Sequence, residues 1–327
     1  MQRLISLVTG VIVAAYATIA SPEEIAVGNY GVSANGMPFG VALVKGYFKE
    51  EGLNITGLIS SAGGGTSLRN MLAGGGVPYG EVNPGVVVSA ILAGADLKIV
   101  SDNVLTVAEF VWAVKPDSPI KSLKDFKGKK IGYTNPRSTS QALAVLLLQK
   151  AGYKAEDAEL VKTGGFGPML AALDLDQIDV AAVTEPLWSK VKDKYRVLIT
   201  GAEALPPLDN VVGMTTGEAA KTRGDFIRAV IRARRRAVDF MIKNPDEAGD
   251  LVAKDFNIPP EVARAAVRNL TTSYTQGIPY WGNGQIHLEG MKRIIEVQRS
   301  VGALEGEVDL AKMIDTQFLP EDIRKPK

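Results

Sequence analysis

The sequence contains no cysteine, and only one of its 327 residues is a histidine. Without cysteine the chain can form no disulfide, no thiolate metal site and no cysteine nucleophile. The lone histidine, His287, has no second histidine or cysteine with which to share a zinc ion, so we expect neither a metal site of this kind nor a cofactor. The 37 basic and 36 acidic residues nearly cancel. This balance argues against nucleic acid as a partner, because nucleic acid binding needs an excess of positive charge.

Hydrophobic runs of the roughly 20 residues that a transmembrane helix needs are also missing. The nearest is the apolar segment 4–20 after Arg3, which is typical of a cleaved export signal with cleavage near Ala17 or Ala20. We therefore expect residues 1–20 to be a signal peptide and the mature protein to be periplasmic. Because a bacterial lipoprotein needs a cysteine at its cleavage site, the lack of cysteine predicts a protein without a lipid anchor.

The remaining chain alternates short apolar runs with helical patterns. Its first part places strands at 25–29, 53–59, 77–82 and 97–100, with helices at 38–51, from Thr66 onward and at 84–93 between them. Such alternation predicts a parallel sheet covered by helices on both faces.

The same pattern restarts after a strand that ends at Val114. A strand at 130–133, a helix begun by Ser138 and a strand at 179–183 follow, and a strand at 211–214 returns the chain to the first group before a helical remainder. We predict an α/β fold of two lobes, each a mainly parallel sheet flanked by helices, with a ligand cleft between them. Lobe 1 would comprise residues 21–112 and 210–327, and lobe 2 residues 113–209. Crossings near Trp112 and 208–213 would let the lobes close over a ligand.

Four Xaa-Pro pairs follow predicted strands, and each is expected to open a helix, since proline suits the first helical position. They are Met37-Pro38, Asn83-Pro84, Asn135-Pro136 and Glu185-Pro186. The residue before each proline then lies at the carboxyl end of a strand, where open parallel sheets bind ligands. Asn83 and Glu185 become paired ligand candidates from opposite lobes, although capping of their helices explains them equally well.

The loop 134–139 places hydroxyl groups and Arg137 ahead of the helix begun by Ser138. Unpaired N–H groups and the helix dipole favour an anion there, and an arginine can meet a carboxylate or sulfonate through two parallel hydrogen bonds. The alternatives are that Arg137 is simply exposed to solvent and that Glu185 only begins its helix. If both residues bind, an ammonium group of the ligand would face Glu185.

Glycine turns and aromatic residues complete the predicted ligand site. Gly64 and Gly65 either present backbone N–H groups to the ligand ahead of a helix begun at Thr66, or only make a tight turn. Aromatic residues at strand ends and crossings are expected to face the cleft. The full predicted set is Tyr30, Asn35, Gly64, Gly65, Thr66, Asn83, Trp112, Asn135, Arg137, Ser138, Thr139, Gly165, Phe166 and Glu185.

Three segments carry a resemblance to a known family: FGVALVKGYFKEEGLNI at 39–55, KPDSPIKSLKDFKGKKIG at 115–132 and DVAAVTEPL at 179–187. The second is typical of bilobed binding proteins at large. Together with the first segment, it makes the chain resemble the solute-binding proteins of ABC importers in the nitrate, taurine and aliphatic-sulfonate group. This group is related to the proteins that bind precursors of the thiamine pyrimidine. The resemblance implies a type II periplasmic binding fold, capture of one small solute in the cleft, and delivery to a permease in the inner membrane.

We therefore predict an extracytoplasmic solute receptor, and not an enzyme, for a small anionic or zwitterionic organic solute such as a sulfonate, a taurine-like compound or a carboxylate. A monomer is expected. Two alternatives stay open: an enzyme of thiamine pyrimidine precursor synthesis on the same fold, and a ligand-sensing module. The letters of penicillin-recognising enzymes also occur, as in Ser118-Pro119-Ile120-Lys121, but their order is wrong and the serine does not open a helix.

Overall fold

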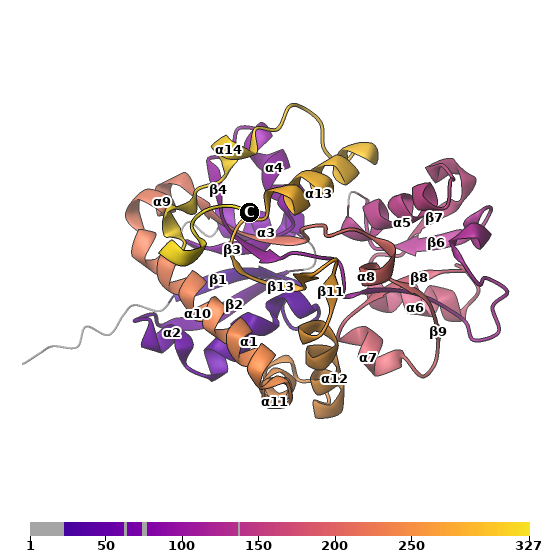
Figure 1. Ribbon diagram of the computed structural model, residues 1–327, viewed down its shortest axis with the longest axis horizontal. Coiled ribbons are helices and arrows are strands. Elements are labelled where there is room, and N and C mark those ends of the chain that lie inside the picture. Colours follow the sequence, from indigo (N-terminus) through magenta and orange to yellow (C-terminus); the bar gives the residue numbers. More distant parts are fainter. Residues whose placement is uncertain (1–22, 62–63, 74–76, 137) are drawn as a thin grey trace, which may run out of the picture.

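The computed structural model describes residues 23–61, 64–73, 77–136 and 138–327. The predicted signal peptide and Arg137 lie outside these residues. The described chain forms two hydrophobic cores. Figure 1 shows the two groups of helices and strands that surround them side by side. We call the core around strands β1–β4 the first core and the core around strand β5 the second core.

The first core surrounds a six-stranded sheet with the order β13-β4-β10-β3-β1-β2. Its strands are β1 (Glu23–Gly28), β2 (Ile55–Ser61), β3 (Gly80–Val82), β4 (Leu97–Val104), β10 (Val211–Thr216) and β13 (Trp281–Gly284). β1 runs parallel to β2 and β3, whereas β10 runs antiparallel to β3 and β4. The sheet is therefore mixed. The chain leaves for the second core at the carboxyl end of β4 and returns at the same end of that strand. β10 must therefore run antiparallel to β4.

Helices cover both faces of this sheet, as the buried run Ile25, Ala26 and Val27 in β1 requires. One face carries α1 (Met37–Val44), α10 (Gly224–Lys243) and α11 (Pro245–Phe256), which pack on one another; the other carries α3 (Gly64–Ala73), α4 (Pro84–Leu92) and α13 (Leu288–Ser300) (Figure 1). Shorter or peripheral elements are α2 (Tyr47–Glu50), α9 (Gly217–Thr222), α12 (Pro260–Thr271), α14 (Leu310–Met313), β11 (Tyr274–Thr275) and β12 (Ile278–Pro279).

Two predicted elements of this half differ from the structure. The helix expected at 38–51 is divided into α1 and α2, because Gly46 between them has a left-handed φ of 76°. The strand expected at 77–82 shrinks to β3, and Pro78 lies just before it, where its missing N–H costs the sheet no hydrogen bond.

The second core surrounds the antiparallel sheet β8-β5-β9, and a single bridge between Ile131 and Val180 links this sheet to the parallel pair β6 and β7. The strands are β5 (Phe110–Val114), β6 (Lys130–Tyr133), β7 (Glu159–Lys162), β8 (Ala181–Thr184) and β9 (Arg196–Thr200). The helices are α5 (Thr139–Lys150), α6 (Phe166–Asp174), α7 (Leu187–Val191) and α8 (Gly201–Ala204). This half is thus also mixed, since β5 runs against both of its neighbours.

Ser138 begins α5 as predicted, because its side chain accepts a hydrogen bond from the backbone N–H of Gln141 at 3.2 Å. The expected role of proline holds for Pro38 and Pro84, which occupy the first turn of their helices. It is wrong for the other two. Pro136 lies in the turn before the Ser138 cap, and Pro186 is itself the cap of α7.

Helix α13 contributes to both cores. Met291 and Ile295 are buried in the first core, whereas Ile294, from the same turn, is fully buried in the second. α13 accordingly contacts α4 of the first core and α5 of the second. A second contact between the halves joins α12 to α7.

Helix α10 carries five arginines, at 228, 232, 234, 235 and 236. The helical spacing of its apolar residues predicts that the arginines lie on a solvated face. Arg232 and Arg235 fit this expectation and form ion pairs at the surface with Glu51 at 2.7 Å and Asp322 at 2.5 Å. Arg234 does not, because it points into the first core, where its Nε lies 3.6 Å from the fully buried Glu81 carboxylate. Two backbone carbonyls, of Gly282 and Asn103, accept hydrogen bonds from its guanidinium.

Candidate functional site

Polar side chains from both halves meet where the two cores adjoin. We call this set the junction: Asn83, Glu109, Thr139, Glu185, Asn210, Asn269 and Tyr280. Chain topology places them there. Asn83 follows β3, Glu109 precedes β5, Glu185 follows β8 and Asn210 precedes β10, so strand ends of both sheets point to one region.

Asn83 connects the halves directly. Its Nδ2 donates to Thr139 Oγ1 at 2.8 Å and to the Asn210 carbonyl at 3.3 Å. Thr139 Oγ1 in turn donates to Asn210 Oδ1 at 3.2 Å. At the same time Asn83 Oδ1 accepts from Gly85 N at 2.8 Å and caps α4. Asn83 therefore caps α4, as one interpretation of the sequence has it, and also bonds to the second half. Its contact with a ligand stays a prediction.

Glu109 and Glu185 are neighbours across the β5–β8 ladder. Phe110 pairs with Thr184, and one position further the Glu185 N–H donates to the Glu109 carbonyl at 3.2 Å. Glu109 Oε1 accepts from Asn210 Nδ2 at 2.5 Å, whereas Glu109 Oε2 is buried and accepts no hydrogen bond from any described residue. Burial raises the pKa of Glu109 to about 8.

The Glu185 carboxylate is held from both halves. Its Oε1 accepts from Asn269 Nδ2 of α12 at 2.7 Å, and its Oε2 accepts from the Ser189 N–H of α7 at 3.1 Å. Burial raises the pKa of Glu185 as well, and these hydrogen bonds oppose the shift. Glu185 is thus a contact between halves in addition to any role in beginning α7.

The predicted aromatic wall is arranged differently from the expectation. Trp112 is fully buried within the second core, and its indole N–H has no acceptor among the described residues. Phe110 stacks on Trp112 and meets Phe166 edge-on, each with ring centroids 6.0 Å apart. Of the three rings only Phe166 is partly exposed, so Trp112 supports the aromatic cluster and does not face a cleft.

Tyr30 and Asn35 face the first core and its helices. The Tyr30 hydroxyl donates to Asp255 of α11, and its ring meets Phe256 edge-on at 5.1 Å. Asn35 Nδ2 donates to the Gly28 carbonyl at 3.1 Å and to Glu81 Oε1 at 3.4 Å. These partners satisfy the polar atoms that we expected to meet a ligand.

The remaining predicted residues serve helix starts and turns. Gly64 and Gly65 form the first turn of α3 instead of a loop before it, and Thr66 accepts from the Arg69 side chain at 2.9 Å. Asn135 is exposed in the turn before α5, where its carbonyl accepts from the Ser138 N–H at 3.1 Å. Gly165 caps α6, and Arg137 lies outside the described residues.

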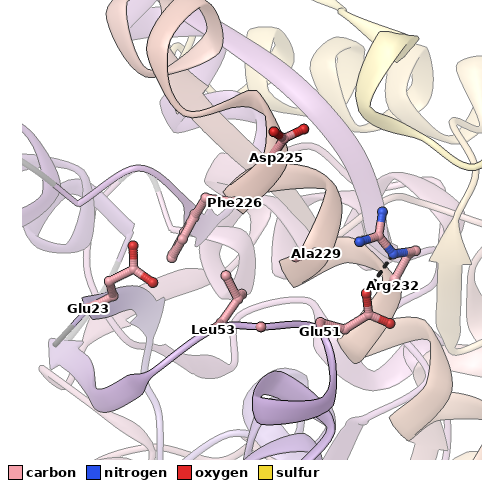
Figure 2. Close-up of a pocket in the computed structure, with 8 residues that line it drawn as sticks. Glu23, Glu51, Leu53, Asp225, Phe226, Ala229 and Arg232 are labelled. Atoms are coloured by element: carbon pink, nitrogen blue, oxygen red, sulfur yellow. Dashed lines mark hydrogen bonds and ion pairs between the residues drawn. The ribbon is translucent and has the colours of Figure 1, made fainter. Parts of the chain in front are cut away.

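Two cavities lie away from the junction. One, of about 370 Å³, is lined by Glu23, Leu53, Phe226 and the Glu51–Arg232 ion pair, at the amino end of β1 (Figure 2). Its other two acids form ion pairs with arginines outside the lining: Glu23 binds Arg223, and Asp225 binds Arg228 at 3.0 Å.

The other cavity, of about 250 Å³, adjoins the return crossing and is lined by Asp209, His287, Arg293 and neighbouring apolar residues. Beside it the Asp209 and Asp102 carboxyl groups face each other, and the backbone N–H of His287 donates to Asp102 Oδ2 at 3.2 Å. Burial raises the pKa of both aspartates. Gly290 lacks the side chain that would collide with Asp209, so this pair can lie against the first turn of α13.

Searches of the described ranges find no group of three or more histidine or acidic side chains placed to bind a metal. The same ranges hold no helix with the length and apolarity that a membrane crossing requires.

Comparison with known proteins settles the family. A family model described as NMT1/THI5 like matches residues 33–248, which cover most of both cores. The chain belongs to the NMT1/THI5-like family. The resemblance inferred from the three sequence segments is thereby confirmed.

Several solved structures similar to this NMT1/THI5-like chain are described as periplasmic binding proteins. The aliphatic sulphonate binding protein SsuA from Escherichia coli is 20% identical with a TM-score of 0.74, over 90% of this chain and 92% of that chain. The nitrate-binding protein NrtA from Synechocystis is 16% identical with a TM-score of 0.60, over 81% and 72%. At such identities the likeness shows the fold: this is the periplasmic binding protein fold, as predicted.

Among curated proteins, the riboflavin-binding protein RibY from Chloroflexus aurantiacus is 23% identical over 297 residues, which is 86% of this chain and 82% of RibY. The similar proteins named here thus carry sulfonate, nitrate and riboflavin in their descriptions. These solutes differ widely in size and charge, so the solute of this chain has to be argued from its own junction.

Four junction residues were missed from the sequence. Glu109 is the only acid in the otherwise apolar and small-residue run 104–114, which is a readable signal. Asn210 lies in the predicted crossing 208–213. Asn269 stands in the middle of an amphipathic helix, and Tyr280 follows Gly277-Ile278-Pro279. Nothing in the spacing of either residue points to the junction.

Proposed function

We propose that this protein is an extracytoplasmic solute receptor of an ABC importer, which binds one small organic solute between two lobes and delivers it to a permease. The observation that carries the proposal is the junction itself. Asn83 of one half bonds to Thr139 of the other at 2.8 Å, and Asn269 bonds to Glu185 at 2.7 Å. Polar groups thus link the halves across a boundary between two apolar cores.

The two lobes of the proposal follow the two cores. β5 pairs with β8 and β9 of the second core, which favours a first crossing at 105–109, just before the predicted boundary at residue 112. The return crossing runs from Leu205 to Asn210 and ends in β10. Because both crossings are short, rotation about them can open and close the junction.

The chemistry of the junction favours a receptor over an enzyme. Its described side chains are amides, hydroxyls and two buried carboxyls, which suit hydrogen-bonded recognition of a solute. Thiamine pyrimidine precursor synthesis on this fold uses histidine and cysteine in fungal relatives, and this chain has no cysteine. Export to the periplasm and a monomeric state are parts of the same proposal.

A thermal-shift screen of the mature protein tests the proposal. The solutes are sulfonates, carboxylates, nitrate, amines and nitrogen heterocycles, because a solute that binds only the folded state raises the melting temperature by mass action. Small-angle scattering with the best solute should show a smaller radius of gyration, and no product should form on prolonged incubation. Turnover of the solute would contradict the receptor assignment.

A further inference from the structure

The buried pair Glu109 and Glu185 indicates the charge of the solute. This inference rests on the proposed receptor function. These residues lie opposite each other at the end of the β5–β8 ladder, so their side chains leave the sheet on the same face. Only 4% of Glu109 and 3% of Glu185 is exposed. Two carboxylates that are this buried, on paired positions of adjacent strands, cannot both be ionised cheaply without a positive charge beside them.

The described residues supply no such charge. The polar groups bonded to the pair are the side-chain amides of Asn210 and Asn269 and the Ser189 N–H, and none of the described lysines or arginines forms an ion pair with either acid. The buried Arg234 is directed to Glu81 instead. Within the part of the chain that the structure describes, the pair therefore has hydrogen-bond donors but no counter-ion.

Two polar atoms at this place are also open. Glu109 Oε2 and the Tyr280 hydroxyl are both buried, and neither has a hydrogen-bond partner within the described part of the chain. They are electrostatic neighbours: burial raises the pKa of Tyr280, and the charges of Glu109, Glu81 and Glu185 raise it further. Buried polar atoms are normally paired, so an acceptor and a hydroxyl left open together indicate a group that the structure does not contain.

We propose that Glu109 and Glu185, with the Tyr280 hydroxyl, form the recognition site for a positively charged nitrogen group of the solute, an ammonium, an amidinium or a protonated aminoheterocycle. The solute replaces a proton. In the free protein the two acids retain one proton; when the cation binds, that O–H bond breaks, the proton passes to the buffer, and both carboxylates accept hydrogen bonds from the nitrogen.

Calorimetry of the mature protein near pH 7 tests this directly. The probes are benzamidine, 4-aminopyridine and butylammonium, which are all cations at this pH, set against benzoate and butanesulfonate as anions of similar size. Each titration is run in phosphate and in Tris, because the difference in the buffers' ionisation enthalpies reports protons released. We expect at least one cation to bind with release of close to one proton, and the anions to bind at least tenfold more weakly.

Glu109→Gln preserves size and the Asn210 contact and should weaken cation binding at least tenfold, with proton release abolished. Glu159→Gln, at an exposed position on β7, is the matched control and should bind normally. Tyr280→Phe removes only the open hydroxyl and should weaken binding without changing proton release.

The outcomes separate the two proposals. If an anion binds tightly, the cations do not, and Glu109→Gln leaves affinity unchanged, the charge assignment is wrong and the receptor function stands. If cations bind without proton release in the wild-type protein, the two acids do not retain a proton in the free protein, and that part of the proposal is wrong whatever the variants do. If neither charge class nor any solute of the wider screen binds, the receptor function falls as well.

Discussion

At the residue scale, Asn83 performs two tasks that single substitutions can separate. Serine in its place keeps a cap for α4 but removes the Nδ2 donor to Thr139. Serine caps about as well as asparagine, whereas alanine costs roughly 1 kcal/mol at such a position. We expect Asn83→Ser to unfold in urea like the wild type and Asn83→Ala to be destabilised.

Both variants should enlarge the radius of gyration of the ligand-free protein in small-angle scattering, because the bond across the junction is lost. Thr139→Val removes the same bond from the other half and should do likewise. An unchanged radius in all three variants would show that this bond does not hold the halves together.

The glycines at the start of α3 give a second test. A Cβ at Gly65 would meet only an Arg69 side-chain nitrogen, at 3.8 Å, and its φ is not left-handed. Gly65→Ala should therefore stabilise the protein by about 0.5–1 kcal/mol in urea unfolding. At Gly213 a Cβ would collide with the Tyr79 and Ser101 hydroxyls, so Gly213→Ala is the destabilised comparison.

The same Gly65→Ala variant decides whether its turn contacts the solute. Tenfold weaker binding in a stabilised protein supports the predicted backbone contact. Normal affinity means that the glycine pair is simply the first turn of a helix.

Residue positions were predictable from sequence where one strand determines them. Asn83 and Glu185 were found because each precedes a proline at a strand end, and both lie in the junction. Tyr30, Asn35 and Trp112 were predicted from their positions near strands and crossings, yet their side chains point into neighbouring layers. Position along the chain does not reveal which face a side chain takes. Asn269 comes from a helix remote in sequence, so only the tertiary packing brings it to Glu185.

At the element scale, α13 offers a stability test of the boundary between the halves. Ile294 is fully buried in the second core, although its helix also packs on α4 of the first. Truncation to alanine leaves a cavity there and should cost about 2–4 kcal/mol in urea unfolding. Leu288, partly buried at the start of the same helix, is the control and should lose less on substitution. Equal losses would contradict a specific role of Ile294 in the second core.

Element types were largely predictable, because hydrophobic periodicity and caps such as Ser138 are local signals. The mixed strand directions, by contrast, could not be predicted from local signals. That β10 inserts antiparallel between β3 and β4, and that β13 extends the sheet, depends on where a returning chain finds an open edge. Gly46 is a second example. A glycine inside an apolar helical pattern is compatible with a continuous helix or with a break, and only its backbone φ in the structure shows that the helix is divided.

At the scale of the whole molecule, buried acids set the pH dependence of stability. Burial raises the pKa of Glu81 to about 7 and of Glu109 to about 8, and raises those of Asp102 and Asp209. A folded state with raised carboxyl pKa values binds more protons than the unfolded state. Its contribution to stability is therefore complete below about pH 4 and is lost as the pH rises through 7 to 8.

We expect the free energy of unfolding to fall steadily between pH 5 and pH 8. His287 acts in the opposite direction, because burial lowers its pKa, but it is one group against several buried acids. Urea unfolding at four pH values measures the slope, and Asp209→Asn should flatten it. A stability that rises steadily with pH would contradict the assignment of protonated acids to the fold.

The position of α13 has a consequence for how the protein melts. A helix whose neighbouring residues belong to different cores cannot leave one core without disturbing the other. Two-lobed chains can show two heat-absorption peaks, one for each lobe. Here the calorimetric trace should contain a single peak, with calorimetric and van't Hoff enthalpies that agree, and Ile294→Ala should be the substitution that splits it.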